Sequence, residues 1–258
     1  MTADNGITVH ESFEQGTPAW FEARAGIVTA SNVHKLLTPR LGVADNATSR
    51  GLIYRLAMER LTGHPVDAGA TTFAMRRGTE LEPYAREHFK QHWLADGQTL
   101  TEAGFITRDH EATDTAPAYR IGYSPDGLID DDGILEIKCP GPEKFLTWFE
   151  DWEATRREYG QAAYVPAEHM LQVQAGLYVS GRTRGVFMAY TPGLTPIVSY
   201  TVSDPAWVNT IKAAVQAAET KVNALVNLHR TATSGEPFDP WFDPFDEEAT
   251  VIDLCPTN

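Results

Sequence analysis

The chain has 258 residues, of which 42% are hydrophobic and 22% charged, and this composition is typical of a globular protein with one large domain or two small ones. No stretch approaches the roughly 18 consecutive apolar residues of a membrane span, and the N-terminus lacks the basic and apolar regions of a signal peptide. We therefore expect a cytoplasmic protein with no membrane partner. Cys139 and Cys255 form no Cys-x-x-Cys pair, so any metal is expected to be held by oxygen.

The formal net charge of −14 would disfavour a nucleic-acid partner if it were spread evenly along the chain. Residues 231–258, however, contain seven acidic residues and no Lys or Arg, so half of the excess lies there. Because DNA binding needs only a locally basic surface, net charge does not exclude it. We predict one domain over residues 1–230 and an acidic, Pro-rich and aromatic tail over 231–258, which either docks a partner, covers the protein's own basic groove, or has no role.

The helical elements are predicted from end signals and from apolar spacing. Thr17 followed by Pro18 is a favourable helix start, and Gly63 is a favourable stop. The pattern Thr79-x-x-Glu82 is typical of a capping box at a helix start. In chain order, the predicted helices cover residues 18–25, 29–37, 48–61, a run that follows the segment 76–83 and contains Ala85, Phe89 and Trp93, and residues 143–152, 167–179 and 204–228.

The strands are predicted from short runs of β-branched and aromatic residues bounded by turn residues. Asp130-Asp131-Asp132-Gly133 is a hairpin turn between two of them. The predicted strands cover residues 100–107, 119–123, 127–129, 134–138, 185–190 and 197–202. The order of helices and strands predicts an α+β domain with a mixed sheet at its centre.

The hairpin around residues 130–133 carries the chemistry. Side chains alternate along a strand, so Glu136 and Lys138 point the same way and Ile137 points into the core. The turn folds the preceding strand back and brings Asp126 opposite Glu136, within a register uncertainty of one residue. Two carboxylates and one ammonium group are therefore predicted at one end of the sheet.

This set of groups suits metal-assisted attack on a phosphodiester. Asp126 and Glu136, with the Ile137 carbonyl, provide the hard oxygen ligands that Mg²⁺ takes while keeping several waters. Lys138 would orient the nucleophile or stabilise the developing negative charge. The alternative is a surface hairpin whose Glu136–Lys138 ion pair contributes under about 1 kcal/mol. The apolar residues of this strand favour the first interpretation, since burial makes unmatched charges costly.

Five motifs in order give the chain a resemblance to a known family. They are Glu14-Gln15-Gly16 with Trp20, Arg24, Gly26 and Thr29-Ala30-Ser31; Arg77-Gly78 with Glu82 and Ala85-Arg86; Ser124-Pro125-Asp126-Gly127-Leu128; Leu135-Glu136-Ile137-Lys138-Cys139-Pro140; and Gln172-Val173-Gln174 with Tyr178. From about Glu14 to Leu228 the chain resembles the phage lambda exonuclease-like, YqaJ-type viral recombinase branch of the PD-(D/E)xK nucleases. The acidic tail is not part of that pattern.

The resemblance implies a restriction-endonuclease-like core, an α/β sandwich with a central mixed β-sheet flanked by helices. It also implies that Asp126, Glu136 and Glu82 are metal ligands and that Lys138 is the catalytic lysine, with Gln172 and Gln174 in the active site. For Glu82, the residues alone favour helix capping. Gln174 and Tyr178 share a helix face that could touch the scissile strand or Lys138, with plain surface packing as the alternative.

Arg24 and Ser31 are candidates for reading a DNA end. A helix N-terminus at Ser31 offers free N–H groups to an anion, and Arg24 can make a bidentate phosphate contact. In the family this region receives the 5′-phosphorylated end. The alternative is that Ser31 is a simple N-cap and Arg24 is a surface cation.

The expected function is that of a Mg²⁺-dependent exonuclease, with Mn²⁺ as a substitute, that digests one strand of linear double-stranded DNA from the 5′ end. It would release mononucleotides and leave 3′ overhangs for phage-type recombination. The resemblance further implies a ring-shaped homotrimer, a single-strand annealing protein as partner, and a phage protein acting in the cytoplasm of a bacterial host. An endonuclease or 3′-directed nuclease on the same core, and a non-catalytic module that binds DNA ends, remain as alternatives.

Overall fold

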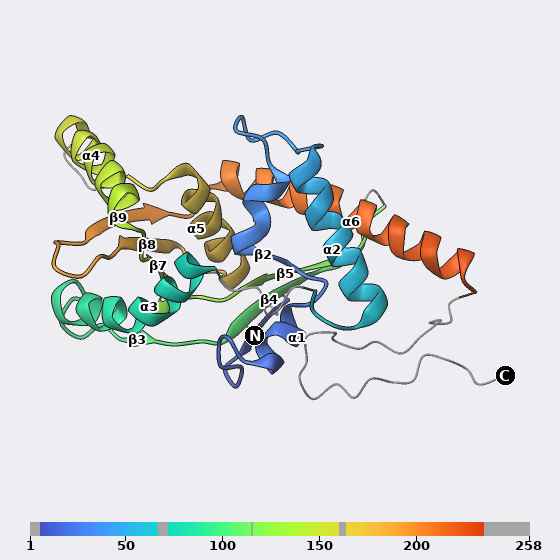
Figure 1. The fold of residues 1–258 in the computed structure, drawn as a ribbon, viewed down its shortest axis with the longest axis horizontal. Helices are drawn as coiled ribbons and strands as arrows, with labels where there is room; N and C mark the ends of the chain where they lie inside the picture. The colour runs from blue at the N-terminus through green and yellow to red at the C-terminus, as the bar shows by residue number, and fades with distance from the viewer. Residues whose placement is uncertain (1–5, 67–71, 115, 160–163, 235–258) are drawn as a thin grey trace.

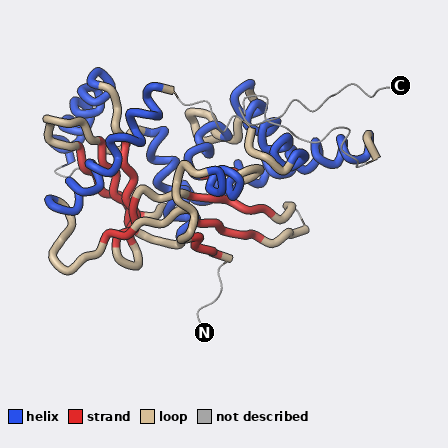
Figure 2. The backbone as a smooth tube through the Cα atoms, turned by 60° about the horizontal axis from the view of Figure 1, so that its bottom comes forward, coloured by secondary structure: helices blue, strands red, loops and turns tan. Residues whose placement is uncertain are grey.

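The strands form two mixed sheets, where the sequence predicts one. Figure 1 shows the computed structural model, which describes residues 6–66, 72–114, 116–159 and 164–234. The first sheet has the order β1-β4-β5-β2, and the second has the order β3-β6-β7-β8-β9. Figure 2 shows them as two separate groups of strands. The α+β class predicted from the sequence is confirmed. Most of the predicted acidic tail lies outside the described residues.

The strand boundaries agree closely with prediction from residue 119 onward. In chain order the strands are β1 (Ile7–His10), β2 (Val28–Thr29), β3 (Leu100–Thr101), β4 (Phe105–His110), β5 (Tyr119–Tyr123), β6 (Gly127–Ile129), β7 (Gly133–Lys138), β8 (Arg184–Ala189) and β9 (Ile197–Val202). The short strands β1 and β2 were not predicted. Each is four residues or fewer, and its pairing depends on distant partners in β4 and β5.

The predicted strand over residues 100–107 was wrong, because β3 and β4 belong to different sheets. The strand is interrupted at Gly104, where the N-terminal segment passes against it. A Cβ atom at Gly104 would lie 1.7 Å from the carbonyl oxygen of Phe13, so only glycine allows this crossing. The two sheets are joined a second time by Ser124-Pro125-Asp126, which connects β5 to β6. The predicted catalytic motif therefore lies at the junction of the sheets.

The helices confirm most of the predicted end signals. They are α1 (Pro18–Arg24), α2 (Ala47–Thr62), α3 (Phe73–His92), α4 (Pro142–Tyr159), α5 (Ala167–Ser180) and α6 (Pro205–Ala232), and η1 (Ala30–Leu36) is a 3₁₀ helix. Thr17 caps α1 by accepting from the Trp20 N–H, and Gly63 ends α2 with φ of 77°. No helix of the described residues is long and apolar enough to cross a membrane.

The start of α3 was predicted wrongly. The helix begins at Phe73, six residues before Thr79, the N-cap of the predicted capping box, and its N-cap is Thr72, which accepts from the Met75 N–H at 3.2 Å. Pro83 therefore lies in the helix interior, where proline costs roughly 3 kcal/mol. Ala85 and Phe89, which follow it, are buried against the second sheet, and this tertiary packing offsets the local penalty. Glu82 is consequently not a capping residue.

The helix predicted over residues 29–37 is the 3₁₀ helix η1. Its N-cap is Thr29, which makes no side-chain capping hydrogen bond. Ser31 is the second helical residue, so its predicted role as an N-cap was wrong. Val33 and Leu36 are buried, and their three-residue spacing suits the 3₁₀ repeat.

Helix α5 holds the two sheets together. It packs against β4 and β5 of the first sheet and against β7 and β8 of the second (Figure 1). Its residues Val173 and Leu177 belong to a core cluster that also contains Tyr123 from β5 and Ile134 from β7. On its other face, β7 packs Leu135 and Ile137 against α3. The strand that carries Glu136 is thus covered on both faces, by α5 on one and α3 on the other.

Candidate active site

The predicted pairing of Asp126 with Glu136 is confirmed by the register of β6 and β7. The two strands are antiparallel and Gly127 lies opposite Leu135, so Asp126, one residue before Gly127, is opposite Glu136, one residue after Leu135. The Asp126 carboxylate also accepts the Ile137 N–H, at 2.6 Å from N to Oδ2. Its side chain is thereby fixed against the end of β7. Local pairing rules were sufficient to predict this arrangement, because a tight turn leaves the two strands little choice of register.

Glu136 is held by hydrogen bonds from three elements. It is 1% exposed, and its Oε1 accepts the Lys138 ammonium at 2.5 Å as well as the Gln172 amide of α5. Its Oε2 accepts the hydroxyl of Tyr123, from β5, at 3.3 Å. The predicted association of Glu136, Lys138 and Gln172 is therefore seen directly. Tyr123 was missed, although it lies three residues before Asp126 and its position at the end of a buried strand was visible in the sequence.

Glu82 reaches the site through Arg86. The two side chains form an ion pair one turn apart on α3, and the Arg86 Nε–H donates to the Asp126 carbonyl oxygen at 2.7 Å. Arg86 also contacts Glu102 at 3.0 Å. This arginine links the helix to the loop that carries Asp126. The spacing of four residues between Glu82 and Arg86 could have predicted this ion pair from the sequence.

The site has more negative than positive charge in a buried setting. Burial, reinforced by the charge of Asp126, raises the pKa of Glu136 to about 7 against the attraction of Lys138. Burial and the same aspartate raise the pKa of Glu82 to about 7, and burial raises the pKa of Asp126. Burial alone would lower the pKa of Lys138, but the charges of Glu136 and Asp126 raise it above its ordinary value. An additional cation would relieve this imbalance.

The donor set suits Mg²⁺, which does not need a closed cage of protein ligands. Across the described ranges, no three or more His, Cys, Asp or Glu side chains gather into a group that could hold a metal ion, so Glu82 does not complete a cluster with Asp126 and Glu136. Two buried carboxylates at adjacent strand ends remain. Mg²⁺ is bound through one or two carboxylates plus waters and substrate phosphates, and these residues fit that requirement.

Gln174 does not join the active site, and its predicted catalytic placement was wrong. Its amide donates to the Val202 carbonyl at 2.8 Å, and its oxygen accepts the Asp204 N–H at 2.9 Å. It therefore ties the end of β9 to the start of α6. The reason is helical geometry, since residues two positions apart on a helix point about 200° apart. Gln172 and Gln174 cannot both face Glu136.

Tyr178 also has its partners away from Lys138. Its hydroxyl contacts the Tyr119 hydroxyl at 3.2 Å and His110 Nε2 at 2.5 Å. These partners come from the opposite end of β5 and from β4. Of the predicted residues on α5, Gln172 is the one that contacts Glu136.

Arg24 is bonded to Ser124, in the loop that leads to Asp126. Its guanidinium donates to Ser124 Oγ at 2.8 Å and lies 3.9 Å from the centre of the Trp20 ring. Burial and the nearby charge of Arg55 lower its pKa to about 10. Ser124 stands two residues before Asp126, so this arginine approaches the predicted metal site. Ser31 contacts Thr29 instead, at 3.1 Å between their hydroxyl oxygens.

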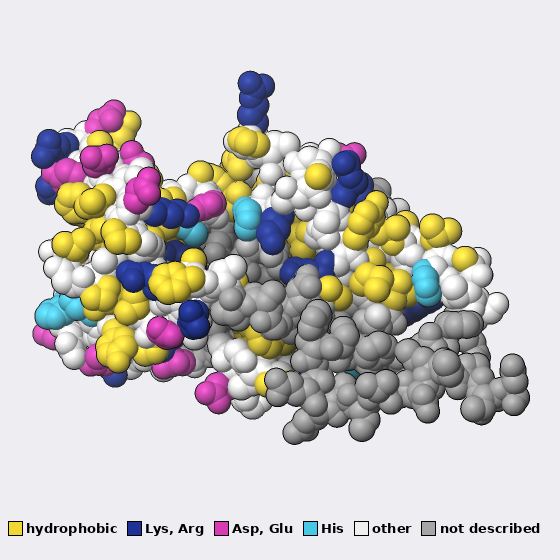
Figure 3. Space-filling view, in the orientation of Figure 1, with side chains coloured by type: hydrophobic (Ala, Val, Ile, Leu, Met, Phe, Trp, Pro, Cys, Tyr) yellow, Lys and Arg dark blue, Asp and Glu magenta, His cyan; other side chains and the backbone are white. Residues whose placement is uncertain are grey.

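Several basic side chains form a series that we term the basic strip. Burial lowers the pKa of several of these groups, and neighbouring positive charges lower it further. The charge of Lys35 does so for His34, and that of Arg55 for Lys35 and Arg24. The charges of Lys138 and Lys144 do so for His169. Figure 3 shows Lys, Arg and His side chains in the middle of one face, between the part with α3 and α4 and the part with α2. Part of the charge of the basic strip is matched, since Lys144 pairs with Glu168 and Arg55 with Glu59, and burial lowers the pKa of His169 to about 3, so that this imidazole is neutral. The members of the basic strip are Arg24, His34, Lys35, Arg55, Lys138, Lys144 and His169.

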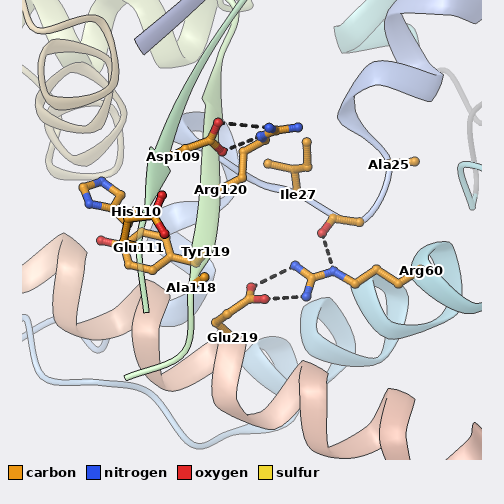
Figure 4. Close-up of a pocket in the computed structure, with 11 residues that line it drawn as sticks. Ala25, Ile27, Arg60, Asp109, His110, Glu111, Ala118, Tyr119, Arg120 and Glu219 are labelled. Atoms are coloured by element: carbon orange, nitrogen blue, oxygen red, sulfur yellow. Dashed lines mark hydrogen bonds and ion pairs between the residues drawn. The ribbon is translucent and has the colours of Figure 1, made fainter. Parts of the chain in front are cut away.

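A cavity of about 570 Å³ lies between α2, α6 and the outer ends of β4 and β5. Figure 4 shows that its charged side chains point at one another: Arg60 pairs with Glu219, and Arg120 pairs with Asp109. The described residues that line it include none of the predicted catalytic residues. Because these charges are paired within the lining, the cavity does not compete with the carboxylate pair as the candidate site.

Comparison with known proteins agrees with the fold. The model of the YqaJ-like viral recombinase domain matches residues 19–183. The alkaline exonuclease LHK-Exo from Laribacter hongkongensis is 30% identical, with a TM-score of 0.65 over 84% of this chain and 99% of that one. Its complex with dAMP is similar, with 28% identity, a TM-score of 0.66, and coverage of 84% and 98%. A search of curated proteins gave no match.

A phage-related exonuclease from Haemophilus somnus shares the fold at 15% identity, with a TM-score of 0.53 over 79% of this chain and 96% of that one. Fold and site together define a chain with the architecture of PD-(D/E)xK-type exonucleases. The chain belongs to the family of the YqaJ-like viral recombinase domain, and the resemblance identified from the five motifs is confirmed. Family and structural relatives support a DNA nuclease of the exonuclease type as its class.

Proposed function

We propose that the protein is a Mg²⁺-dependent exonuclease that digests one strand of linear double-stranded DNA from the 5′ end. The observation that carries this proposal is the buried carboxylate pair, with Lys138 bonded to Glu136 and Arg24 bonded to the loop that precedes Asp126. A metal-assisted phosphodiester cleavage needs the first two features. A preference for a phosphorylated end needs the third.

In this proposal Asp126 and Glu136 hold the metal ion, with the Ile137 carbonyl as a further donor and Glu82 acting through a water. When bound, Mg²⁺ or Mn²⁺ would polarise the phosphodiester and make a nearby water more acidic. Lys138 is positively charged beside Glu136 and would stabilise the developing negative charge on the phosphate. Gln172 keeps Glu136 oriented by donating to its Oε1.

The polarity of digestion is supported by the position of Arg24. A terminal phosphate near Ser124 would meet the guanidinium, and the basic strip offers further positive charge for the DNA backbone. Ser31 follows Arg24 by seven residues in the sequence, but its hydroxyl contacts that of Thr29. The Laribacter relative was solved with dAMP, which is chemically a mononucleotide product. Digestion from one 5′ end would leave a 3′ overhang.

The biological setting follows from the family alone. A viral recombinase family fits a phage-encoded enzyme that acts in the bacterial cytoplasm and passes its 3′ overhangs to a single-strand annealing protein. We include a ring-shaped homotrimer around DNA in the proposal, since enclosure of the substrate would make digestion processive. The docking role considered for the acidic tail concerns residues that are mostly outside the described part of the chain.

Strand-resolved digestion of a linear duplex, labelled separately at each 5′ and 3′ end, tests the proposal. With Mg²⁺ we expect release of mononucleotides from the 5′ end of each strand. The rate should be higher with a 5′-phosphate than with a 5′-hydroxyl, and Arg24→Ala should abolish this difference. Release from the 3′ ends first, or efficient cutting of covalently closed circles, would favour the rival nucleases. DNA-end binding without release would indicate a non-catalytic module.

A further inference from the structure

The second oxygen of Glu136 is directed by a tyrosine from the other sheet. Oε1 already accepts two donors, Lys138 and Gln172, and a carboxylate oxygen has about two lone-pair positions. Oε2 accepts one donor, the Tyr123 hydroxyl, at 3.3 Å. Oε1 is therefore filled, and Oε2 keeps a free lone pair whose direction depends on where Tyr123 stands.

Tyr123 is positioned by an unusual contact with α5. The residue is 1% exposed, and a Cβ atom added at Gly176 would lie 2.7 Å from its Cζ and 2.9 Å from each neighbouring ring carbon. Any other residue at position 176 would push the hydroxyl end of the ring away. Glycine inside a helix costs roughly 0.5–1 kcal/mol relative to alanine, yet it occupies the middle of α5 here. The close approach of ring to helix is therefore a requirement of this site.

We propose that Tyr123, seated on Gly176, is a positioning residue that orients Glu136 so that Oε2 faces the metal position beside Asp126. This inference rests on the proposed metal-dependent function. It assigns the tyrosine no contact with the metal or the substrate. Its effect passes through the carboxylate, as hydrogen bonds behind metal ligands commonly do, and their loss typically weakens metal affinity or activity by about 10–100-fold.

The competing interpretation is that Tyr123 is an ordinary core aromatic whose hydroxyl needs a partner when buried. In that case removal of the hydroxyl would change stability but not metal affinity. Tyr119 offers a matched control on the same strand. It is also buried, and its hydroxyl contacts Tyr178 rather than a carboxylate.

The experiment measures Mn²⁺ binding to the full chain without DNA, from the electron paramagnetic resonance signal of free Mn²⁺. Wild type, Tyr123→Phe and Tyr119→Phe are compared, with thermal unfolding recorded for each. We expect Tyr123→Phe to lower Mn²⁺ affinity about 10-fold or more, with digestion partly restored at high Mg²⁺, and Tyr119→Phe to leave affinity unchanged. Gly176→Ala should weaken affinity in the same direction, because it displaces the ring rather than removing the hydroxyl.

Two results would overturn the inference, and they are distinguishable. If wild type binds Mn²⁺ and digests DNA but Tyr123→Phe binds within twofold of wild type, the positioning role is wrong and the proposed function stands. If wild type neither binds Mn²⁺ nor digests DNA, the proposed function fails and the inference fails with it.

Discussion

Two buried glutamates in this protein have opposite surroundings. Glu219 is 3% exposed and meets the guanidinium of Arg60 with both of its oxygens, one of them at 2.8 Å. Glu136 is 1% exposed and meets one ammonium, but it shares this charge with Asp126 and Glu82. The first is one anion with one cation in a forked pair. The second belongs to a group of three carboxylates, Asp126, Glu136 and Glu82, that has two cations, Lys138 and Arg86, and so one positive charge too few.

This difference separates structural from functional burial. A carboxylate that is buried only for stability is expected to have its charge matched within the protein, as Glu219 has. A carboxylate site that is short of a cation has a pKa raised by burial and by its neighbours, as seen for Glu136 at about 7. The comparison predicts that changes at the two sites affect different measurements: activity and metal response at one, stability at the other.

The largest effect is expected for Lys138→Ala. Lys138 is the cation that would face the developing charge, and loss of such a group typically costs on the order of 10²–10³-fold in rate. The side chain is 26% exposed, like that of Arg60, and its loss leaves Glu136 buried without its cation, so we expect a loss of stability as well and the rate is measured on folded enzyme. Nucleotide release under single-turnover conditions measures the rate, with Lys90→Ala on the exposed face of α3 as the control. A loss below tenfold would contradict the assignment.

The next effect is expected at the structural pair. Arg60→Met leaves Glu219 buried without its partner, and breaking such a pair typically costs about 3–5 kcal/mol. Since Arg60 is 24% exposed, we expect about 3 kcal/mol from urea unfolding. Arg120→Met in the same cavity is a matched control, because its pair with Asp109 is 54% and 43% exposed and should contribute under about 1 kcal/mol. The turnover rate of folded enzyme should be unchanged in both variants, and a tenfold loss for Arg60→Met would remove the distinction.

A third comparison uses the two glutamines of α5. Gln172→Ala removes a donor to Glu136 and should lower the rate by about 10–100-fold with little change in stability. Gln174→Ala leaves the Asp204 N–H and the Val202 carbonyl without partners and should cost about 1–3 kcal/mol of stability with little change in rate. Rate and urea unfolding are measured for both. The reverse pattern would restore Gln174 to the active site.

The smallest effect is the response of stability to Mg²⁺. At about ten times its dissociation constant the ion should stabilise wild type by about 1.4 kcal/mol, because it binds the folded state only. Asp126→Asn should lose this stabilisation, and Glu219→Gln should retain it. Thermal unfolding with and without Mg²⁺, at constant ionic strength, provides the measurement. Equal responses in the two variants would show that the stabilisation does not come from the carboxylate pair.

Sequence reasoning worked best where contacts are local. The turn at residues 130–133 fixes the register of β6 and β7, so Asp126, Glu136 and Lys138 could be placed together from alternation alone. It worked least well where local signals competed. Thr79 and Glu82 had the spacing of a capping box, but α3 begins earlier, at Phe73, where Thr72 caps the helix by accepting from the Met75 N–H.

The sequence by itself determined the paired carboxylates, the lysine beside them, the α+β order and the family, because these depend on residue type, spacing and short-range geometry. Only the tertiary structure decided that Gln172 and not Gln174 faces Glu136, that Arg24 reaches Ser124, and that Tyr123 crosses from one sheet to the other. Those contacts join elements 13 to 100 residues apart. Their geometry is set by how α5 packs between the two sheets, and no local pattern encodes that orientation.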